Sequence, residues 1–274
     1  MALHTRITGK VIRGIIEPIE NIYTKELKSF FTDVSDLTRF ILRFFRELFN
    51  PPFELKEFIR QCHLIGYKSF PLVALTGFII GLVMTIQARP TLLQFGAESW
   101  LPAMVSISII REIGPVITAL IFAGKVGSGI GAELGSMKVT EQIDAMEVSG
   151  INPFRFLVVT RILAATLMLP ILVILADSIS LYGTYVGVNL QGDVSFQLFF
   201  LQVLEKVTFA DIFPSIVKTF VFGFAIGMIG CYKGYNAANG TEGVGKASNT
   251  AVILASLSVF VIDMIAVQIT SLIQ

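Results

Sequence analysis

Five apolar runs, each long enough to cross a bilayer as a helix, constrain this chain more than any other feature of its sequence. They cover about residues 69–88, 101–124, 162–189, 216–232 and 250–272. A helix needs about 20 apolar residues to cross about 30 Å of hydrocarbon. The sequence therefore predicts an all-α polytopic membrane protein with about five transmembrane helices.

The composition agrees with a membrane protein and excludes several other classes. Of the 274 residues, 54% are hydrophobic and 15% are charged, whereas a soluble domain carries about 25% charged residues. A net charge of +1 gives no reason to expect a nucleic-acid partner. Cys62 and Cys231 lie far apart without a CxxC motif, so we expect no disulfide framework. The first apolar run begins near Ser69, which is too late for a secretory signal peptide.

Residues 1–66 form a separate N-terminal region that we expect at the cytoplasmic face of the membrane. Residues 1–68 hold 11 of the 21 Lys and Arg residues. Apolar side chains recur at helical spacing between residues 30 and 49, with Arg39, Arg43 and Arg46 among them. This pattern predicts an amphipathic helix in the membrane interface, ending before Pro51, and a second short helix over 54–67. The alternative is a helical pair packed on a soluble partner.

The distribution of basic residues predicts how the chain is oriented. With a cytoplasmic N-terminus, the inner segments carry the N-terminal bases together with Lys125, Lys138, Arg155, Arg161, Lys233 and Lys246. Few bases remain on the outer side, as the positive-inside rule requires. Five spans then place Gln274 on the outer side. We expect a bacterial inner membrane, with the plastid inner envelope as the alternative.

The sequence gives no support for catalysis by this chain. The stretch Gly240–Ala247 is close to a phosphate-binding P-loop, but Ala247 stands where a Ser or Thr must reach magnesium. We expect a tight cytoplasmic turn there, made possible by Gly240, Gly243 and Gly245. With only His4 and His63 present, neither a Ser-His-Asp triad nor a multi-histidine metal site can be built readily. We therefore predict no enzyme, no metal site and no cofactor in this chain.

Two adjacent charges inside the second apolar run, Arg111 and Glu112, are the candidate substrate contacts. A charge at mid-bilayer costs about 2.5–3.5 kcal/mol on insertion scales, so it usually faces a bundle interior or a water-filled cavity. Pro115 lacks the N–H that would bond the carbonyl of Arg111, so the helix should loosen where the charges lie. The sequence leaves two interpretations open. One is a polar cavity that binds a charged or amphiphilic substrate. The other is a structural ion pair with Asp177, Asp263 or Lys218.

Small residues recur every four positions after these charges, from Ala119 to Gly135. The same spacing occurs in Gly77–Gly81, Gly183–Gly187 and Gly223–Gly227. Helices in lipid associate through close backbone packing at such positions. We interpret these residues as structural contacts between helices.

Residues 133–149 form an acidic amphipathic segment that is too short and too charged to span the membrane. Val139, Ile143 and Met146 form an apolar stripe among the acids. Its negative charge disfavours an anionic lipid surface, whereas an apolar stripe flanked by acids suits a groove on a partner protein. The alternative is an ordinary loop with one helical turn.

Several motifs in and around this central region resemble the MlaE permease family. They are Arg111–Val116, Ala123–Lys125 with Gly127 and Ser128, Ala132–Met137, Thr140–Met146, Pro153 with Arg161, and the glycines of 240–247. The resemblance covers roughly residues 60–272. Arg89 and Pro90, expected in the first outer loop, depart from the family pattern.

The resemblance implies a permease domain over 67–274 that belongs to an ABC transporter for phospholipid. It implies two permease copies and two separate ATPase subunits, which bind ATP and magnesium, and an outer MCE-domain lipid carrier. Residues 133–149 would be the coupling helix, with the ATPase contacts Glu133, Met137, Glu141, Ile143, Asp144, Met146 and Glu147. The positions matching the family's lipid cavity are Glu112, Arg111 and Phe95. Two other hypotheses remain: a secondary transporter driven by protons through Glu112 and Asp263, and a scaffold that passes no substrate.

Overall fold

The computed structural model describes residues 32, 34–190, 192 and 194–273. The described residues are mostly helical and include no strand, so the all-α prediction is confirmed. Within them, five helical stretches are long and apolar enough to cross a membrane. The chain divides into two units, residues 1–49 and 50–274.

The first unit contains a helix over residues 34–48. The rings of Phe44 and Phe45 meet edge-on in it, with their centroids 5.3 Å apart. A helix is thus present before Pro51, where the amphipathic helix was predicted, and its place in the membrane interface stays a prediction. The start of the predicted helix, at residues 30, 31 and 33, lies outside the described residues, as do residues 1–29 and the predicted outer end of the chain at Gln274.

The first span is longer than its apolar run. It comprises α2 (Leu55–Cys62), a π-helical turn (His63–Tyr67) and α3 (Phe70–Gln94). Arg89 and Pro90, expected in the outer loop, are part of α3. The guanidinium of Arg89 lies 2.5 Å from the carboxylate of Glu98, which follows the end of α3.

The second span contains two breaks. After a short 3₁₀ turn (Glu98–Trp100) it runs through α4 (Leu101–Ser108), a π-helical turn (Ile109–Ile113), α5 (Gly114–Phe122), a second π-helical turn (Ala123–Gly127) and α6 (Ser128–Val139). The prediction of one helix over 133–149 is wrong. Residues 133–139 continue α6, Glu141 adopts a left-handed conformation with φ 58°, and the separate α7 covers Gln142–Val148.

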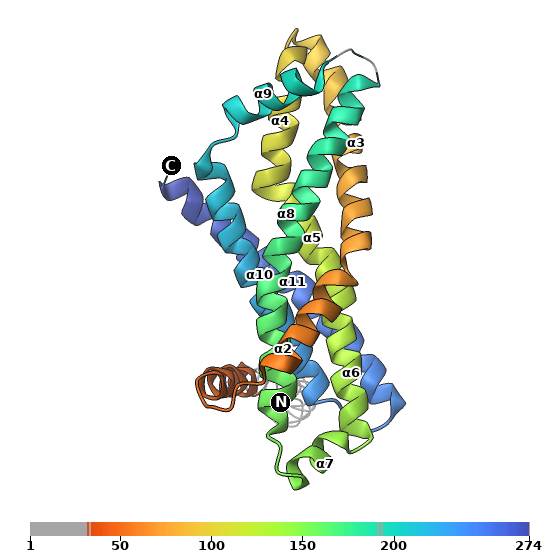
Figure 1. Ribbon diagram of the computed structural model, residues 1–274, viewed down its shortest axis with the longest axis vertical. Helices are drawn as coiled ribbons and strands as arrows, with labels where there is room; N and C mark the ends of the chain where they lie inside the picture. Colours follow the sequence, from red (N-terminus) through yellow and green to blue (C-terminus); the bar gives the residue numbers. More distant parts are fainter. Residues whose placement is uncertain (1–31, 33, 191, 193, 274) are drawn as a thin grey trace, which may run out of the picture. The chain divides into compact units, whose positions relative to one another are not determined.

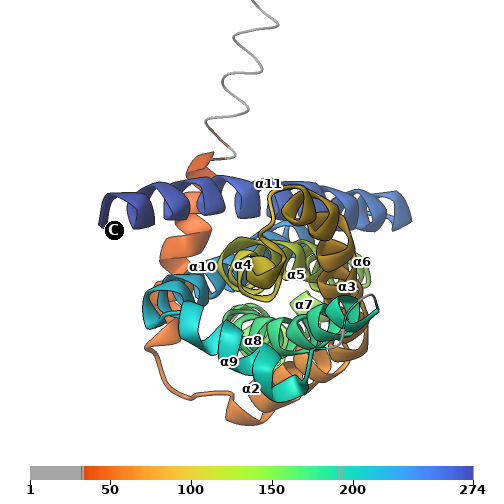
Figure 2. The ribbon, with the colours of Figure 1, turned by 90° about the horizontal axis from the view of Figure 1, so that it is seen from above.

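Three further spans complete the bundle. A π-helical turn (Phe154–Val159) leads into α8 (Thr160–Asn189), and α10 (Phe209–Tyr235) and α11 (Thr241–Ile273) follow the short α9 (Phe196–Lys206). Helix α8 packs between α3 and α10, while α11 packs on α10 and α6. In residues 50–273, α7 lies at one end of the bundle, and α9 with the start of α4 lies at the other (Figure 1). Seen from above, α11 runs along one side of the bundle and α8 lies across from it (Figure 2).

Glycines bring α3 and α8 into backbone contact, as predicted for the small-residue motifs. A Cβ added to Gly81 would stand 1.9 Å from the carbonyl oxygen of Ser180. The hydroxyl of Ser180 donates a hydrogen bond of 2.8 Å to the carbonyl of Gly77. Close packing and an interhelical hydrogen bond together stabilise this pair, as expected where lipid supplies little hydrophobic drive between helices.

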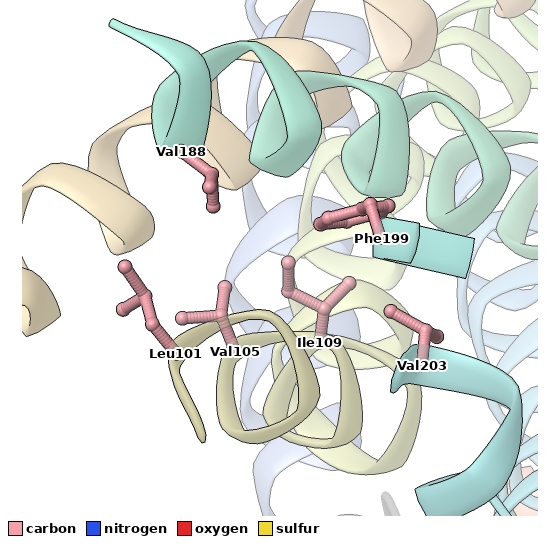
Figure 3. Close-up of a cluster of buried hydrophobic side chains, with 6 residues drawn as sticks. All are labelled: Leu101, Val105, Ile109, Val188, Phe199 and Val203. Atoms are coloured by element: carbon pink, nitrogen blue, oxygen red, sulfur yellow. The ribbon is translucent and has the colours of Figure 1, made fainter. Parts of the chain in front are cut away.

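A cluster of buried side chains fixes α9 across the end of the bundle. Phe199 and Val203 of α9 point toward α4 and α8 in Figure 3. Their partners are Leu101, Val105 and Ile109 on the second span and Val188 on α8. The chain then turns into α10 through a capping box, in which Thr208 and Asp211 satisfy each other's backbone N–H groups. These contacts set where α10 begins.

The glycine-rich turn at 240–245 is the start of a helix. Gly240 has φ +90° and ends the turn, and α11 begins at Thr241. Because helical residues surround it and the described residues include no strand, the stretch has no P-loop geometry. The prediction that Gly243 and Gly245 also belong to the turn is wrong, because both lie in α11. Gly243 is instead required by a close contact, because a Cβ there would lie 2.0 Å from the carbonyl of Ala238.

Candidate functional site

The π-helical turn at Ile109–Ile113 presents Arg111 and Glu112 from the middle of the second span. The loosened helix predicted at Pro115 is therefore confirmed. A π-helical turn inserts an extra residue and often marks a functional position. It aims the two neighbouring side chains at different partners, as their separation of about 100° on a helix predicts.

Glu112 belongs to a three-residue ion cluster that joins three spans. The ammonium nitrogen of Lys218 lies 2.5 Å from a carboxylate oxygen of Glu112 and 2.9 Å from one of Asp263. The Lys218 side chain is buried, whereas that of Glu112 is 46% exposed. Attraction to the two carboxylates offsets the cost of removing the Lys218 ammonium from water. The ion pairing that the sequence left as an alternative is therefore present for Glu112.

Arg111 pairs with Asp211 in the first turn of α10. Asp211 also accepts hydrogen bonds from the backbone N–H and the hydroxyl of Thr208, each 2.8 Å long. The carboxylate is therefore fixed from two sides, and it holds the guanidinium at the rim of the bundle. Sequence reasoning missed Asp211. The signal that could have found it is the capping-box spacing of Thr208 and Asp211 before an apolar run.

These charges line a polar cavity of about 180 Å³. It lies between the π-helical turn, the start of α10 and the end of α11. The polar and charged lining residues are Arg111, Glu112, Asp211, Ser215, Lys218, Thr270 and Ser271. The cavity thus presents both cations and carboxylates.

An apolar cavity of about 780 Å³ adjoins the polar one along α10 and α11. The two share Lys218, Pro214 and Thr270 among their lining residues. The apolar walls are Phe209, Phe213, Val217, Val221, Ile262, Ile265 and Ile269. A charged pocket continuous with an apolar one is suited to an amphiphile.

Phe95 and Asp177 line neither cavity. Phe95 follows the end of α3, is 80% exposed and lines neither cavity. Asp177 on α8 presses against Gly114, where an added Cβ would stand 1.8 Å from its carboxylate oxygen. That oxygen has no hydrogen-bond partner among the described residues. The predicted structural role of Asp177 is consistent with this contact, and the glycine is required by it.

The other candidate site lies at the opposite end of the bundle, around α7. Ile143 is only 2% exposed, because it packs against its own chain. The exposed apolar residues are Val148, which is 90% exposed, and Ile151, which is 44% exposed. The predicted stripe is therefore wrong for Ile143, which is not available to a partner. The outward apolar surface lies at the end of α7.

The remaining predicted coupling residues are divided between two helices. Met137 lies on α6, Glu141 at the junction, and Asp144, Met146 and Glu147 on α7. The ammonium nitrogen of Lys138 lies 3.0 Å from a carboxylate oxygen of Asp144 across the junction. Glu133 lies farther back on α6 and pairs with Arg161 of α8.

Cysteine and histidine side chains form no site of their own in the described part of the chain. Cys62 and Cys231 are free thiols. His63 stacks on Tyr67 with ring centroids 5.1 Å apart. No cluster of three or more potential metal ligands occurs among the described residues.

Comparison with known proteins identifies relatives along most of the chain. The family model for the permease MlaE matches residues 58–269. A probable ABC transporter permease protein of Rickettsia typhi is 34% identical over 89% of this chain and 94% of its own length. The intermembrane phospholipid transport system permease protein MlaE of Haemophilus influenzae is 34% identical over 85% of this chain and 95% of its own. A probable ABC transporter permease protein of Synechocystis is 35% identical over 74% of this chain and 77% of its own length.

Proposed function

This chain belongs to the MlaE permease family, and from that premise we propose that it is the permease subunit of an ABC transporter that moves phospholipid between membranes. The relatives share nearly their whole length with it. The conclusion rests above all on one observation, the continuity of a charged cavity with an apolar one between α10 and α11.

The two cavities match the two parts of a phospholipid. The head group would lie against Arg111, Glu112 and Lys218, and the acyl chains would lie between α10 and α11. A zwitterionic head group can interact with both signs of charge that the polar cavity presents. Exposed Phe209 and Phe213 stand where the chains would enter. Arg111 and Glu112 are thus proposed to contact substrate while they also pair within the bundle.

A separate ATPase would dock on the exposed end of α7. Val148 and Ile151 supply the apolar contact, and Glu141, Asp144 and Glu147 supply negative charge around it. ATP and magnesium would bind in that partner, since the sequence at 240–247 lacks P-loop chemistry. Closure of the ATPases would move α7 and reshape the cavity through α6.

The assembly we propose contains two copies of this chain, two ATPases and an outer MCE-domain lipid carrier. Positive charge on the inner segments supports a cytoplasmic N-terminus and a C-terminus on the outer side. The membrane is a bacterial inner membrane in this proposal, with the plastid inner envelope as the alternative.

Mass spectrometry of lipid retained by the purified protein tests the cavity assignment. Glu112→Ala should lower the amount of bound phospholipid, since it removes a head-group contact and frees Lys218. The matched control is Glu98→Ala, because Glu98 is 45% exposed and also pairs with a base at 2.5 Å, but at the outer end of the bundle. Equal lipid in both variants and in wild type would remove the cavity from the proposal.

A further inference from the structure

We infer that the ion pair between Glu133 and Arg161 is a positioning contact that fixes α6 against α8, and that it sets how much lipid is moved for each ATP hydrolysed. The inference rests on the proposed function for its transport readout. It also changes the role of Glu133, which the sequence assigns to the ATPase interface.

The geometry joins a buried cation to a half-exposed carboxylate. The guanidinium of Arg161 lies 2.9 Å from the Glu133 carboxylate. The Arg161 side chain is only 2% exposed, against 49% for Glu133. A second nitrogen of Arg161 donates 2.9 Å to the carbonyl of Leu157, in its own helical stretch. Glu133 is the one carboxylate paired with Arg161 among the described residues.

Electrostatics make this pair hard to open. A buried cation that loses its counter-ion is still removed from water, and no ion-pair attraction then offsets the free energy of that desolvation. The Leu157 carbonyl is a dipole and cannot replace a full negative charge. If Glu133 turned toward a partner protein, Arg161 would remain buried without its counter-ion. The carboxylate is therefore engaged by Arg161, although about half of the Glu133 side chain is exposed.

Glycine contacts fix α6 on its other sides. A Cβ added to Gly131 would stand 3.2 Å from Ser248 of α11, and one added to Gly234 of α10 would stand 2.9 Å from the carbonyl of Gly131. These backbone contacts leave little space for α6 to move alone. With the ion pair to α8, α6 is held by three helices.

Helix α7 is joined to the bundle at both of its ends, to α6 through residues 140–141 and to the π-helical turn before α8 through residues 149–153. Helix α6 ends at Val139 and α7 begins at Gln142, so a displacement of α7 acts on α6 through two intervening residues. The exposed pair Lys138–Asp144 spans the same junction, but surface pairs contribute little. Glu133–Arg161, with its buried cation, is the ion pair that ties α6 to α8 where these two connections meet the bundle.

The test compares Glu133→Gln, the charge swap Glu133→Arg/Arg161→Glu, and the control Glu98→Gln in the full complex with its ATPase. Affinity for the ATPase subunit, ATP turnover and phospholipid moved per ATP are measured for each. We expect Glu133→Gln to bind the ATPase as wild type does and to move about fivefold less lipid per ATP, the lower end of typical coupling between sites. The swap restores opposite charges but loses the hydrogen bond that Arg161 donates to Leu157, so it should recover part of that loss, and the control should show none.

A distance measurement gives a readout that needs no transport. Spin labels at Val148→Cys and Leu167→Cys, with Cys62 and Cys231 replaced by alanine, report how α7 lies relative to α8. The distance distribution should broaden in Glu133→Gln and narrow again in the swap. If the swap does not fold, Glu133→Gln alone decides through the same readouts.

Two results would overturn the inference. One is weaker ATPase binding by Glu133→Gln, because that outcome makes Glu133 a direct contact. The other is unchanged lipid per ATP with an unchanged distance distribution. A wild-type complex that hydrolyses no ATP or moves no phospholipid would instead refute the proposed function. The spin-label comparison would still test whether the ion pair positions α7 relative to α8.

Discussion

Replacing Lys218 by methionine should destabilise the bundle, because it leaves two carboxylates without their shared cation. Lys218 is the centre of the ion cluster with Glu112 and Asp263. Methionine has a similar length, so the change removes charge while keeping most of the packing. The variant therefore isolates the electrostatic contribution of the cluster.

The magnitude follows from the burial of each partner. Breaking a buried ion pair by removing one member costs about 3–5 kcal/mol. Asp263 is 19% exposed and would bear most of that cost. Glu112 is 46% exposed, so water can solvate its freed carboxylate. We therefore expect a loss at the lower end, about 3 kcal/mol in the free energy of unfolding.

Equilibrium unfolding in mixed micelles measures this loss, and a triple variant provides the control. Glu112→Gln/Lys218→Met/Asp263→Asn removes all three charges, and it should be more stable than Lys218→Met alone because no buried charge is left unpaired. A Lys218→Met protein as stable as wild type would refute the electrostatic reasoning. So would a triple variant less stable than the single one.

Three further predictions concern packing, coupling and topology. Gly81→Ala should lower the free energy of unfolding by about 1–3 kcal/mol, because the new Cβ would lie 1.9 Å from the Ser180 carbonyl oxygen. Gly129→Ala should be neutral or stabilising, because a Cβ there has nothing within 4 Å. Equal free energies of unfolding for the two variants would contradict the packing argument. Val148→Asp should reduce co-purification of the ATPase, whereas the same change at Leu190, at the outer end, should not; an undiminished ATPase yield would exclude α7 as the docking surface. In a background without Cys62 and Cys231, an impermeant maleimide should label Val148→Cys only from the inside and Phe95→Cys only from the outside. Labelling of both from one side would refute the orientation.

The number and type of spans were predictable because apolar length is a local property of the sequence. The ends of the spans were not, since they depend on contacts between distant residues. Arg89 lies inside α3 and pairs with Glu98, which follows the end of that helix. The break at Arg111 was predictable from Pro115 alone, as the missing N–H acts within one turn.

The site could be predicted only in part from the sequence, because it too depends on contacts between distant residues. Glu112 and Arg111 were identified as candidates from their charge in an apolar run, but their partners on α10 and α11 lie about 100 and 150 positions away. The predicted helix over 133–149 also differs from the structure, because the left-handed backbone of Glu141 divides it. That division turns Ile143 inward and leaves Val148 as the exposed apolar residue.

The most direct test of the central claim is phospholipid transfer by the reconstituted complex. This chain is placed in liposomes with labelled phospholipid, together with the ATPase and the MCE-domain carrier proposed as its partners, and transfer to acceptor liposomes is followed with and without ATP. We predict transfer that requires ATP and this chain, and that falls with Glu112→Ala but not with Glu98→Ala. Equal transfer without ATP, or without this chain, would contradict the account.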